Sequence, residues 1–311
     1  MNKPHLVSIG MPVYNCESTI ACSIVSVLNQ SFVDWELIII DDGSTDRTRE
    51  IAASFNDPRI AIFGGGENKG LAARLNECVG KARGKYFARM DGDDIAYPER
   101  LKKQVKYLDC HQEVDLLGAG CVVFRGDGEA YGLRCKKMSS HAEVCGNSLI
   151  GLSVIHPTWI GRIEWFLRNP YRCEFRLTED RELLMRTRDT SHFAVLFEPL
   201  LGYREDNVSL RKTLPARYHL CRAYLEDAFV RGHVLYGFGG VIFQLIKAVI
   251  DGVAIGAGLQ HKILRHRAPF LPDEIRQEWN EVWLQNSGQQ TQATPEQGTE
   301  YVSAQTSRGR Q

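Results

Sequence analysis

The chain lacks an excess of charge of either sign, because 38 lysine and arginine residues balance 38 aspartate and glutamate residues. A protein that mainly binds nucleic acid usually carries a basic domain or stripe, so this balance gives no support to a nucleic-acid partner. The nine cysteines include no Cys-x-x-Cys pair, and their number is odd. Both observations argue against a zinc ribbon and against a disulfide framework.

Long apolar stretches are also missing from the first ten residues, which contain nothing of signal-peptide length. Together with the unpatterned cysteines, this absence predicts a reducing, cytoplasmic compartment. The sequence shows no internal repeat. Its 311 residues are enough for one large domain, or for one domain with an appendage.

The first 125 residues alternate between strand and helix patterns. Near-continuous apolar strands separated by amphipathic helices predict an α/β fold, in which helices cover both faces of a mostly parallel sheet. The strands are expected at 6–13, 36–40, 59–63, 86–90 and 114–124, and the helices at 17–30, 45–55, 68–82 and 98–111. Further helices are expected from 178 to 188, at 215–231 and at 233–260, with a strand at 193–200.

Polar segments follow three of the predicted strands, at residues 12–17, 41–46 and 91–94. Ligands of such sheets lie beyond the carboxyl ends of the strands, and all three segments project to that edge. In the last segment three aspartates occupy four positions, and such like charges repel unless solvent or a cation offsets the repulsion. Mg²⁺ and Mn²⁺ take oxygen ligands and often bridge carboxylates to a substrate phosphate. The segment is therefore a candidate metal–diphosphate site, with a solvated acidic turn as the alternative.

The segment 41–46 reads Asp-Asp-Gly-Ser-Thr-Asp. Its serine or threonine can cap the following helix. Its paired aspartates can accept hydrogen bonds from a base N–H or from a ribose hydroxyl. An EF-hand is excluded, because neither the sixth-position glycine nor the twelfth-position glutamate is present when the loop is counted from either aspartate.

Four motifs follow one another at characteristic intervals: Val-Ser-Ile-Gly-Met-Pro-Val-Tyr-Asn at 7–15, Trp-Glu-Leu-Ile-Ile-Ile-Asp-Asp-Gly-Ser-Thr-Asp at 35–46, Asn-Lys-Gly at 68–70 and Arg-Gly-Lys-Tyr-Phe-Ala-Arg-Met-Asp-Gly-Asp-Asp at 83–94. In this order they resemble glycosyltransferase family 2. Later landmarks are matched by His-Pro-Thr at 156–158, Thr-Glu-Asp at 178–180 and Tyr-Arg at 203–204. The resemblance implies the GT-A fold and transfer of a sugar from a nucleotide diphospho-sugar, with inversion at the anomeric carbon.

The resemblance also implies roles for individual residues. Asp93 corresponds to the carboxylate that binds the divalent metal, Mn²⁺ or Mg²⁺, carried by the donor diphosphate, and Asp180 corresponds to the general base. The implied nucleotide-sugar-binding residues are Pro12, Tyr14 and Glu17 in the loop that borders the nucleotide, Asp42 at the base and Asp91 near the ribose.

The chemistry of inverting transfer suits these roles. A divalent cation stabilises the charge that develops on the leaving diphosphate. A sugar hydroxyl is a poor nucleophile at neutral pH, so a carboxylate must take its proton during attack. Asp180 lies near the start of a predicted helix, where the positive helix end favours the ionised form. Acidic residues are also common in first helical turns for stability alone, which is the alternative reading of Asp180.

Three other polar residues have two interpretations each. His156 can serve as a ligand or as a donor to the acceptor, or it can be a structural histidine with satisfied hydrogen bonds. Arg74 and Arg204 can pair with phosphates in a bidentate manner, or can form structural ion pairs.

The region after residue 214 matches no motif of the family. Between 233 and 260, small and polar residues at spacings of three, four and seven form one narrow stripe on an otherwise apolar helix. Lys247 and Asp251 argue against a transmembrane span. Together with the basic run at 261–267, the pattern favours a helix that lies in the membrane interface. Packing on the catalytic domain or in a dimer is the alternative.

The sequence therefore predicts a GT-A catalytic domain at 1–214, a helical extension at 215–285 and a disordered tail at 286–311 rich in Gln, Thr, Ser and Gly. We expect an inverting, metal-dependent glycosyltransferase at the cytoplasmic face of the membrane, acting on a lipid-linked glycan in surface polysaccharide synthesis. No Gln-x-x-Arg-Trp motif follows Asp180, so addition of one sugar per encounter is favoured.

Two other functions remain open. A nucleotidyltransferase shares the sheet and the metal-binding aspartate, but it needs a glycine-rich loop with a basic residue after the first strand, and residues 10–17 contain none. A non-catalytic protein that binds sugar nucleotides or glycans would keep the fold and lose the base. The presence of Asp91, Asp93 and Asp180 argues against that possibility.

Overall fold

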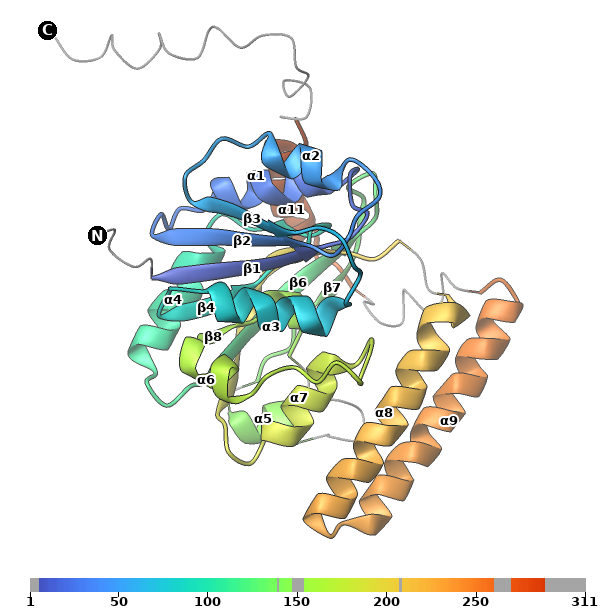
Figure 1. The fold of residues 1–311 in the computed structure, drawn as a ribbon. Helices are drawn as coiled ribbons and strands as arrows, with labels where there is room; N and C mark the ends of the chain where they lie inside the picture. The colour runs from blue at the N-terminus through green and yellow to red at the C-terminus, as the bar shows by residue number, and fades with distance from the viewer. Residues whose placement is uncertain (1–5, 139, 147–153, 207–208, 260–269, 289–311) are drawn as a thin grey trace, which may run out of the picture.

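The computed structural model describes residues 6–138, 140–146, 154–206, 209–259 and 270–288. Within these ranges nine strands form one sheet in the order β3-β2-β1-β4-β8-β6-β9-β5, with β7 paired to β6 (Figure 1). The strands are β1 (Val7–Val13), β2 (Trp35–Asp41), β3 (Ile60–Gly64), β4 (Tyr86–Arg89), β5 (Ile95–Ala96), β6 (Leu116–Phe124), β7 (Ala130–Arg134), β8 (Ile160–Arg162) and β9 (Phe193–Arg204).

The helices lie between these strands in the alternating order that the sequence predicts for its first 125 residues. They are α1 (Ile20–Leu28), α2 (Thr48–Ala53), α3 (Leu71–Lys81), α4 (Arg100–Cys110), α5 (His141–Cys145), α6 (Ile163–Arg168), α7 (Glu179–Thr187), α8 (Leu210–Arg231), α9 (Val234–Gly256) and α11 (Asp273–Ser287), with a 3₁₀ turn η1 (His156–Thr158). The α/β fold class is confirmed.

The sheet is parallel at one end and mixed beyond it. Strands β3, β2, β1 and β4 are parallel neighbours, whereas β8 runs antiparallel between β4 and β6. The reason lies in η1, which ends beside the carboxyl end of β4, so that the chain must run back from that edge. Ile160 at the start of β8 accordingly pairs with Ala88 near the end of β4.

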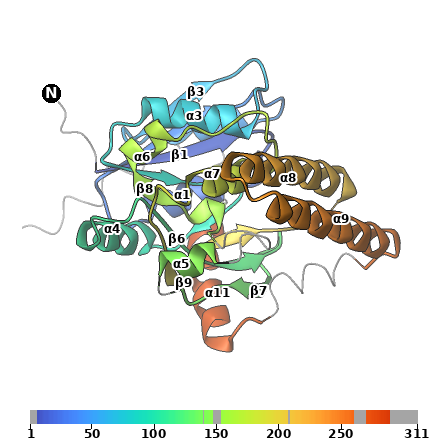
Figure 2. The ribbon, with the colours of Figure 1, turned by 90° about the horizontal axis from the view of Figure 1, so that it is seen from below.

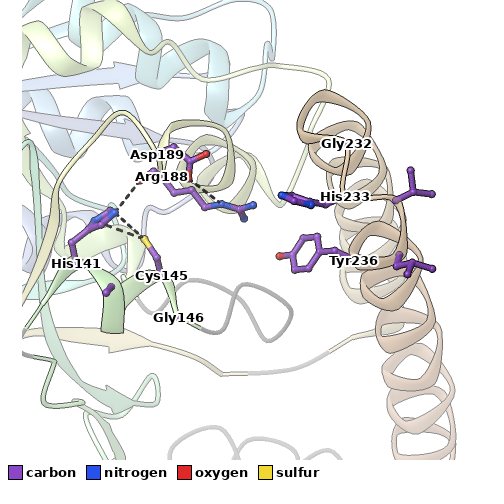
Figure 3. Close-up of a pocket in the computed structure, with 11 residues that line it drawn as sticks. His141, Cys145, Gly146, Arg188, Asp189, Gly232, His233 and Tyr236 are labelled. Carbon is purple, nitrogen blue, oxygen red and sulfur yellow. Dashed lines mark hydrogen bonds and ion pairs between the residues drawn. The ribbon is translucent and has the colours of Figure 1, made fainter.

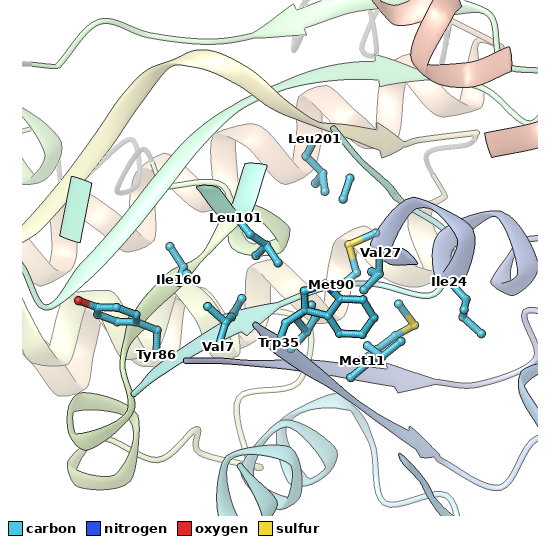
Figure 4. Packing of buried hydrophobic residues seen from close by; sticks show 14 of the residues in the cluster. Val7, Met11, Ile24, Val27, Trp35, Tyr86, Met90, Leu101, Ile160 and Leu201 are labelled. Atoms are coloured by element: carbon cyan, nitrogen blue, oxygen red, sulfur yellow. The ribbon is translucent and has the colours of Figure 1, made fainter. Parts of the chain in front are cut away.

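Alternate strand residues supply two cores, one on each face of the sheet. Leu37 and Ile39 of β2 join a buried cluster with α1 and α4, part of which is shown in Figure 4. Ile38 and Ile40 point to the opposite face, where α3, α6 and α7 contribute the other cluster. Successive side chains of a strand point to opposite faces, so a continuous apolar strand must be covered on both sides.

Helix α11 corrects the predicted boundary between residues 285 and 286. It continues to Ser287, and Asn286 is buried and accepts a hydrogen bond from Asn29 in the chain segment after α1 (Nδ2–Oδ1, 3.1 Å). The helix packs on the sheet, where the ring centroid of the fully buried Trp279 lies 4.6 Å from that of Phe124 in a tilted arrangement. Gly202 of β9 is needed there, since a Cβ would lie 2.1 Å from the Trp279 ring. The predicted disorder of the remaining tail concerns residues outside the described ones.

Helices α8 and α9 form a hairpin beside α7 (Figures 1 and 2). Helix α8 begins at Leu210, so the predicted boundary at residues 214 and 215 falls within its second turn. Its last residue is Arg231, and the capping residue Gly232 has a φ of 71°, which allows the chain to turn back into α9. The hairpin is attached to the sheet domain through α8.

Candidate active site

The loops after β1 and β2 are tied together at the carboxyl edge of the sheet. Asn15 donates its backbone N–H to the hydroxyl of Ser44 (3.0 Å), and its side-chain oxygen accepts the backbone N–H of Thr45 (2.8 Å). Glu17 accepts the backbone N–H of Arg47 at 3.0 Å. These contacts give the predicted nucleotide loop a defined shape before any ligand binds.

The three residues predicted to border the nucleotide occupy different environments. Tyr14 extends from the carboxyl edge with half of its surface exposed. Glu17 is exposed but engaged with the β2–α2 loop, as described above. Pro12 is buried within β1, in register with Ile40 of β2. Of the three, Tyr14 has the side chain most accessible to a ligand.

Asp42, the residue predicted to bind the base, organises the loop before α3. Its Oδ1 accepts hydrogen bonds from the backbone of Lys69 and from Arg74, both at 2.7 Å, and its Oδ2 accepts one from Gly70 at 2.9 Å. The carboxylate is buried and already has three donors. Contact with a base therefore stays a prediction.

Asp91, Asp93 and Asp94 form an acidic cluster directly after β4. One carboxylate oxygen from each lies within 4.8 Å of the others. Burial, together with the charge of Asp91, raises the pKa of Asp93 to about 6. Burial and the charges of Asp93 and Asp91 raise the pKa of Asp94 well above its usual value.

The carboxylate of Asp94 is only partly satisfied. Its Oδ1 accepts the backbone N–H of Arg204 at 2.9 Å, while its buried Oδ2 has no partner among the described residues. Buried carboxylate oxygens normally find a donor or a cation. The three oxygens and the unpartnered atom therefore fit a hard divalent cation.

Arg89 connects the acidic cluster to the predicted base. Its Nη2 lies 2.6 Å from Oδ1 of Asp91, and the side chain is almost fully buried. Burial opposes its charge, but the charges of Asp91, Asp94 and Asp180 outweigh that effect, so the pKa of Arg89 is raised. Its Nε and Nη1 have no partner among the described residues. Arg89 therefore contacts the cluster directly through Asp91, while the charge of Asp180 acts on Arg89 without a direct ion pair among the described residues.

Asp180 stands in the first turn of α7, where the sequence predicts it, and is partly exposed. The preceding Glu179 is buried. Burial and the charge of Asp180 raise the pKa of Glu179 to about 7. Of these two carboxylates, Asp180 is the more accessible.

Comparison with known proteins places this site in a family. The model of glycosyl transferase family 2 matches residues 8–231. The chain belongs to glycosyltransferase family 2. EpsE of Bacillus subtilis (strain 168) is 37% identical over 220 residues, which are 68% of this chain and 77% of EpsE.

Two further proteins are similar to this chain over different shares of its length. The UDP-Glc:alpha-D-GlcNAc-diphosphoundecaprenol beta-1,3-glucosyltransferase WfgD of Escherichia coli is 41% identical over 104 residues, 33% of this chain and 41% of WfgD. The mannosyltransferase PcManGT of Pyrobaculum calidifontis, solved with GDP-Man and Mn²⁺, has a TM-score of 0.54 and 14% identity, covering 93% of this chain and 88% of that chain. This likeness supports the GT-A fold.

In this glycosyltransferase, the three residues with open interpretations all contact other parts of the chain. His156 is buried, its Nε2 lies 3.0 Å from the hydroxyl of Tyr171, and burial lowers its pKa well below the usual value. Arg74 is buried in ion pairs with Asp42 and Glu77. Arg204 binds the backbone of the acidic cluster, its Nε lying 3.0 Å from the carbonyl oxygen of Asp93.

Sequence reasoning missed Arg89 and Glu179 and left Asp94 without a role. Arg89 carries a detectable signal, because a single arginine inside an apolar strand must find a partner when it is buried. The sequence gives no such signal for Glu179, because its raised pKa depends on how α7 packs. The role of Asp94 likewise depends on Arg204, which is distant in the sequence.

A pocket of about 790 Å³ opens at the other end of α7, away from Asp180. Figure 3 shows His141 and Cys145 on one wall, with Arg188, Asp189 and Tyr236 facing them. Its charges are paired internally, since Arg188 bonds to Asp227 at 2.9 Å. Both ring nitrogens of His141 are also bonded, to the carbonyl oxygen of Arg188 and the backbone N–H of Phe193. The Sγ of Cys145 lies 3.5 Å from Nε2 of His141, and burial raises the pKa of this thiol.

Proposed function

We propose that this glycosyltransferase moves one sugar from a nucleotide diphospho-sugar to an acceptor hydroxyl, with inversion at the anomeric carbon. The observation that carries the proposal is the acidic cluster at the carboxyl edge, which Arg89 contacts through Asp91. PcManGT, which has the same fold, was solved with a nucleotide sugar and Mn²⁺. In the proposal, the cluster binds the diphosphate end of the donor through a divalent cation.

The acidic cluster and the two arginines beside it have different tasks in the proposal. Asp93, with Asp91 and Asp94 beside it, would hold a divalent cation. When bound, that cation stabilises the negative charge on the departing diphosphate. Arg89 orients Asp91 through its contact at 2.6 Å. Arg204 fixes the loop backbone from β9.

Asp180 acts as the general base. It accepts the proton of the acceptor hydroxyl while that oxygen attacks the anomeric carbon opposite the leaving group. It lies in the first turn of α7 and is partly exposed, so an acceptor hydroxyl can approach its carboxylate. One displacement of this kind inverts the anomeric centre.

The proposed acceptor is a lipid-linked saccharide. WfgD, as its name states, acts on a sugar attached to diphosphoundecaprenol. The loop before Asp180 lies against α8, where Arg222 stands 4.8 Å from the ring centroid of Phe175. Support for this acceptor thus comes from one relative and from the apolar hairpin beside the candidate base.

Asp93→Ala tests the metal and donor assignment. Calorimetry with a nucleoside diphosphate and Mn²⁺ should show binding to the wild type that is reduced in the variant to the level seen with chelator. Asp109→Ala is the matched control, because Asp109 pairs with Lys85, which precedes β4 at the opposite edge. Unchanged affinity in Asp93→Ala would refute the assignment.

The products distinguish the proposed reaction from the two other functions. A glycosyltransferase releases nucleoside diphosphate when acceptor is added, and the anomeric configuration of the product, measured by NMR, reports inversion. A nucleotidyltransferase would release pyrophosphate from a nucleoside triphosphate instead. A binding protein would release neither.

A further inference from the structure

Helix α9 exposes large apolar side chains along its whole length. It is the one helix, among those in the described ranges, whose length and composition suit a membrane span. The following side chains are each more than half exposed: Val234, Leu235, Phe238, Ile242, Leu245, Ile246, Val249, Ile250 and Val253. An apolar surface of this extent on a soluble protein normally marks an interaction site.

The polar stripe of α9 is the seam of the hairpin. Gly237, Gly240, Gln244 and Asp251 are the buried residues of α9. Arg217 of α8 donates to Gln244 from Nη1 at 2.8 Å and to Asp251 from Nε at 3.0 Å. The stripe recognised in the sequence thus faces α8, and its charge is neutralised within the hairpin.

The exposed side chains cover a wide arc on the side of α9 away from this seam. At 100° per residue, the exposed apolar positions between 234 and 253 fall within about half of the helix circumference. The arc contains no charged residue, and Lys247 lies at its border, with Nζ 4.4 Å from the ring centroid of Phe243. Helix α8 adds exposed apolar side chains of its own, among them Tyr218 and Phe229.

We propose that this hairpin docks the enzyme onto a lipid bilayer, with the outer arc of α9 buried in the interfacial region. Exposed apolar side chains also form a stripe on α8, at Leu214, Tyr218, Leu225 and Phe229. The apolar surface therefore extends over both helices of the hairpin, and its partner must cover a wide area. A fluid hydrocarbon phase covers a wide arc at once.

The attachment of α8 argues for docking in the interface rather than spanning. Its inner side is held to the catalytic domain by charged pairs, including Asp227 with Arg188 (2.9 Å) and Glu226 with Arg172 (3.5 Å). A spanning α9 would carry these charges into the hydrocarbon core, which is costly. In the interface, α8 stays between the bilayer and the catalytic domain.

Docking of this kind would place the acceptor side of the active site near the lipid. The middle of α8 contacts the loop that leads into Asp180, at Arg172 and Phe175. A lipid-linked acceptor would then meet the base without leaving the membrane. The docking surface does not depend on this acceptor, because vesicle binding and sugar transfer are measured separately.

Flotation of the full chain with vesicles tests the proposal. We expect the wild type to float with phosphatidylcholine vesicles, and with vesicles that also contain phosphatidylglycerol, at both low and high ionic strength, because the contact is apolar. The double variant Leu245→Glu/Val249→Glu should reduce the partition coefficient by about tenfold or more. Circular dichroism and the unfolding midpoint show whether it folds.

The matched control is Val33→Glu/Leu167→Glu. These two apolar side chains are exposed on the catalytic domain, at 70% and 59%, outside the hairpin. This control should float as the wild type does. Equal flotation of the folded hairpin variant, or release of the wild type from phosphatidylcholine vesicles by salt, would overturn the proposal.

Light scattering without lipid tests the alternative that a second copy of the chain covers the arc. If the wild type self-associates, fails to float and becomes monomeric in Leu245→Glu/Val249→Glu, the arc is an interface between copies of this chain. A monomeric wild type that floats with phosphatidylcholine supports lipid as the partner.

Discussion

The carboxyl edge of the sheet and the α8–α9 hairpin differ in how their charged side chains are placed. The edge concentrates Asp91, Asp93 and Asp94, and one buried oxygen of Asp94 has no partner there among the described residues. The hairpin buries Arg217 with Asp251 and turns apolar side chains outward. A soluble protein rarely gathers buried like charges or leaves large apolar surfaces exposed. We accordingly propose a cation as the partner of the edge and a lipid phase as the partner of the hairpin.

Asp180→Asn should have the largest effect. That effect should be limited to turnover at the carboxyl edge of the sheet. An amide cannot accept the acceptor proton, and removal of a general base typically lowers turnover about 10²–10⁴-fold. Donor affinity and vesicle flotation should not change. Asp189→Asn, just beyond the other end of α7, serves as the control. Turnover within a few-fold of the wild type would mean that another group is the base.

Arg217→Met should affect the hairpin instead. It leaves the carboxylate of Asp251 buried without its cation, and breaking a buried pair in this way costs about 3–5 kcal/mol. Hydrogen exchange of the α9 amides should become faster, while donor binding is kept. The double variant Arg217→Met/Asp251→Leu should recover most of the protection. Unchanged exchange in the single variant would show that the pair contributes little.

Glu179→Gln should change how stability depends on pH. The pKa of Glu179 is raised from 4.5 to about 7, so the folded state keeps a proton that the unfolded state releases. The free energy of unfolding contributed by this group therefore falls as pH rises through that window. Above pH 7 the variant should be more stable than the wild type, by on the order of 3 kcal/mol. Parallel urea titrations of both proteins across the window would reveal the difference, and identical pH profiles would contradict it.

Substitutions at two adjacent glycines of α9 should have the smallest and most local effects on stability. A Cβ at Gly240 would lie 2.6 Å from Tyr224, whereas one at Gly239 would meet nothing within 4 Å. Gly240→Ala should therefore destabilise the hairpin by about 1–3 kcal/mol. Gly239→Ala should stabilise it by about 0.5–1 kcal/mol, because alanine is the better helix former. Thermal unfolding that ranks the two variants the other way would place the seam on another face.

Local patterns in the sequence determined much of this protein. The alternation of apolar strands and amphipathic helices predicts the sheet, since burial on both faces requires continuous apolar strands. The acidic cluster after β4 and Asp180 in the first turn of α7 follow from motifs only a few residues long. Such features depend on neighbours in the chain, so they can be read without a structure.

Tertiary structure alone decided which groups meet across long separations. Asp42 engages Arg74, and the charge of Asp180 acts on Arg89. The polar stripe of α9 proved to be a seam because Arg217 lies opposite it, and α11 returns to the first half of the chain. A buried polar group must find a partner, but the sequence does not say which one, because that choice depends on how separate elements pack.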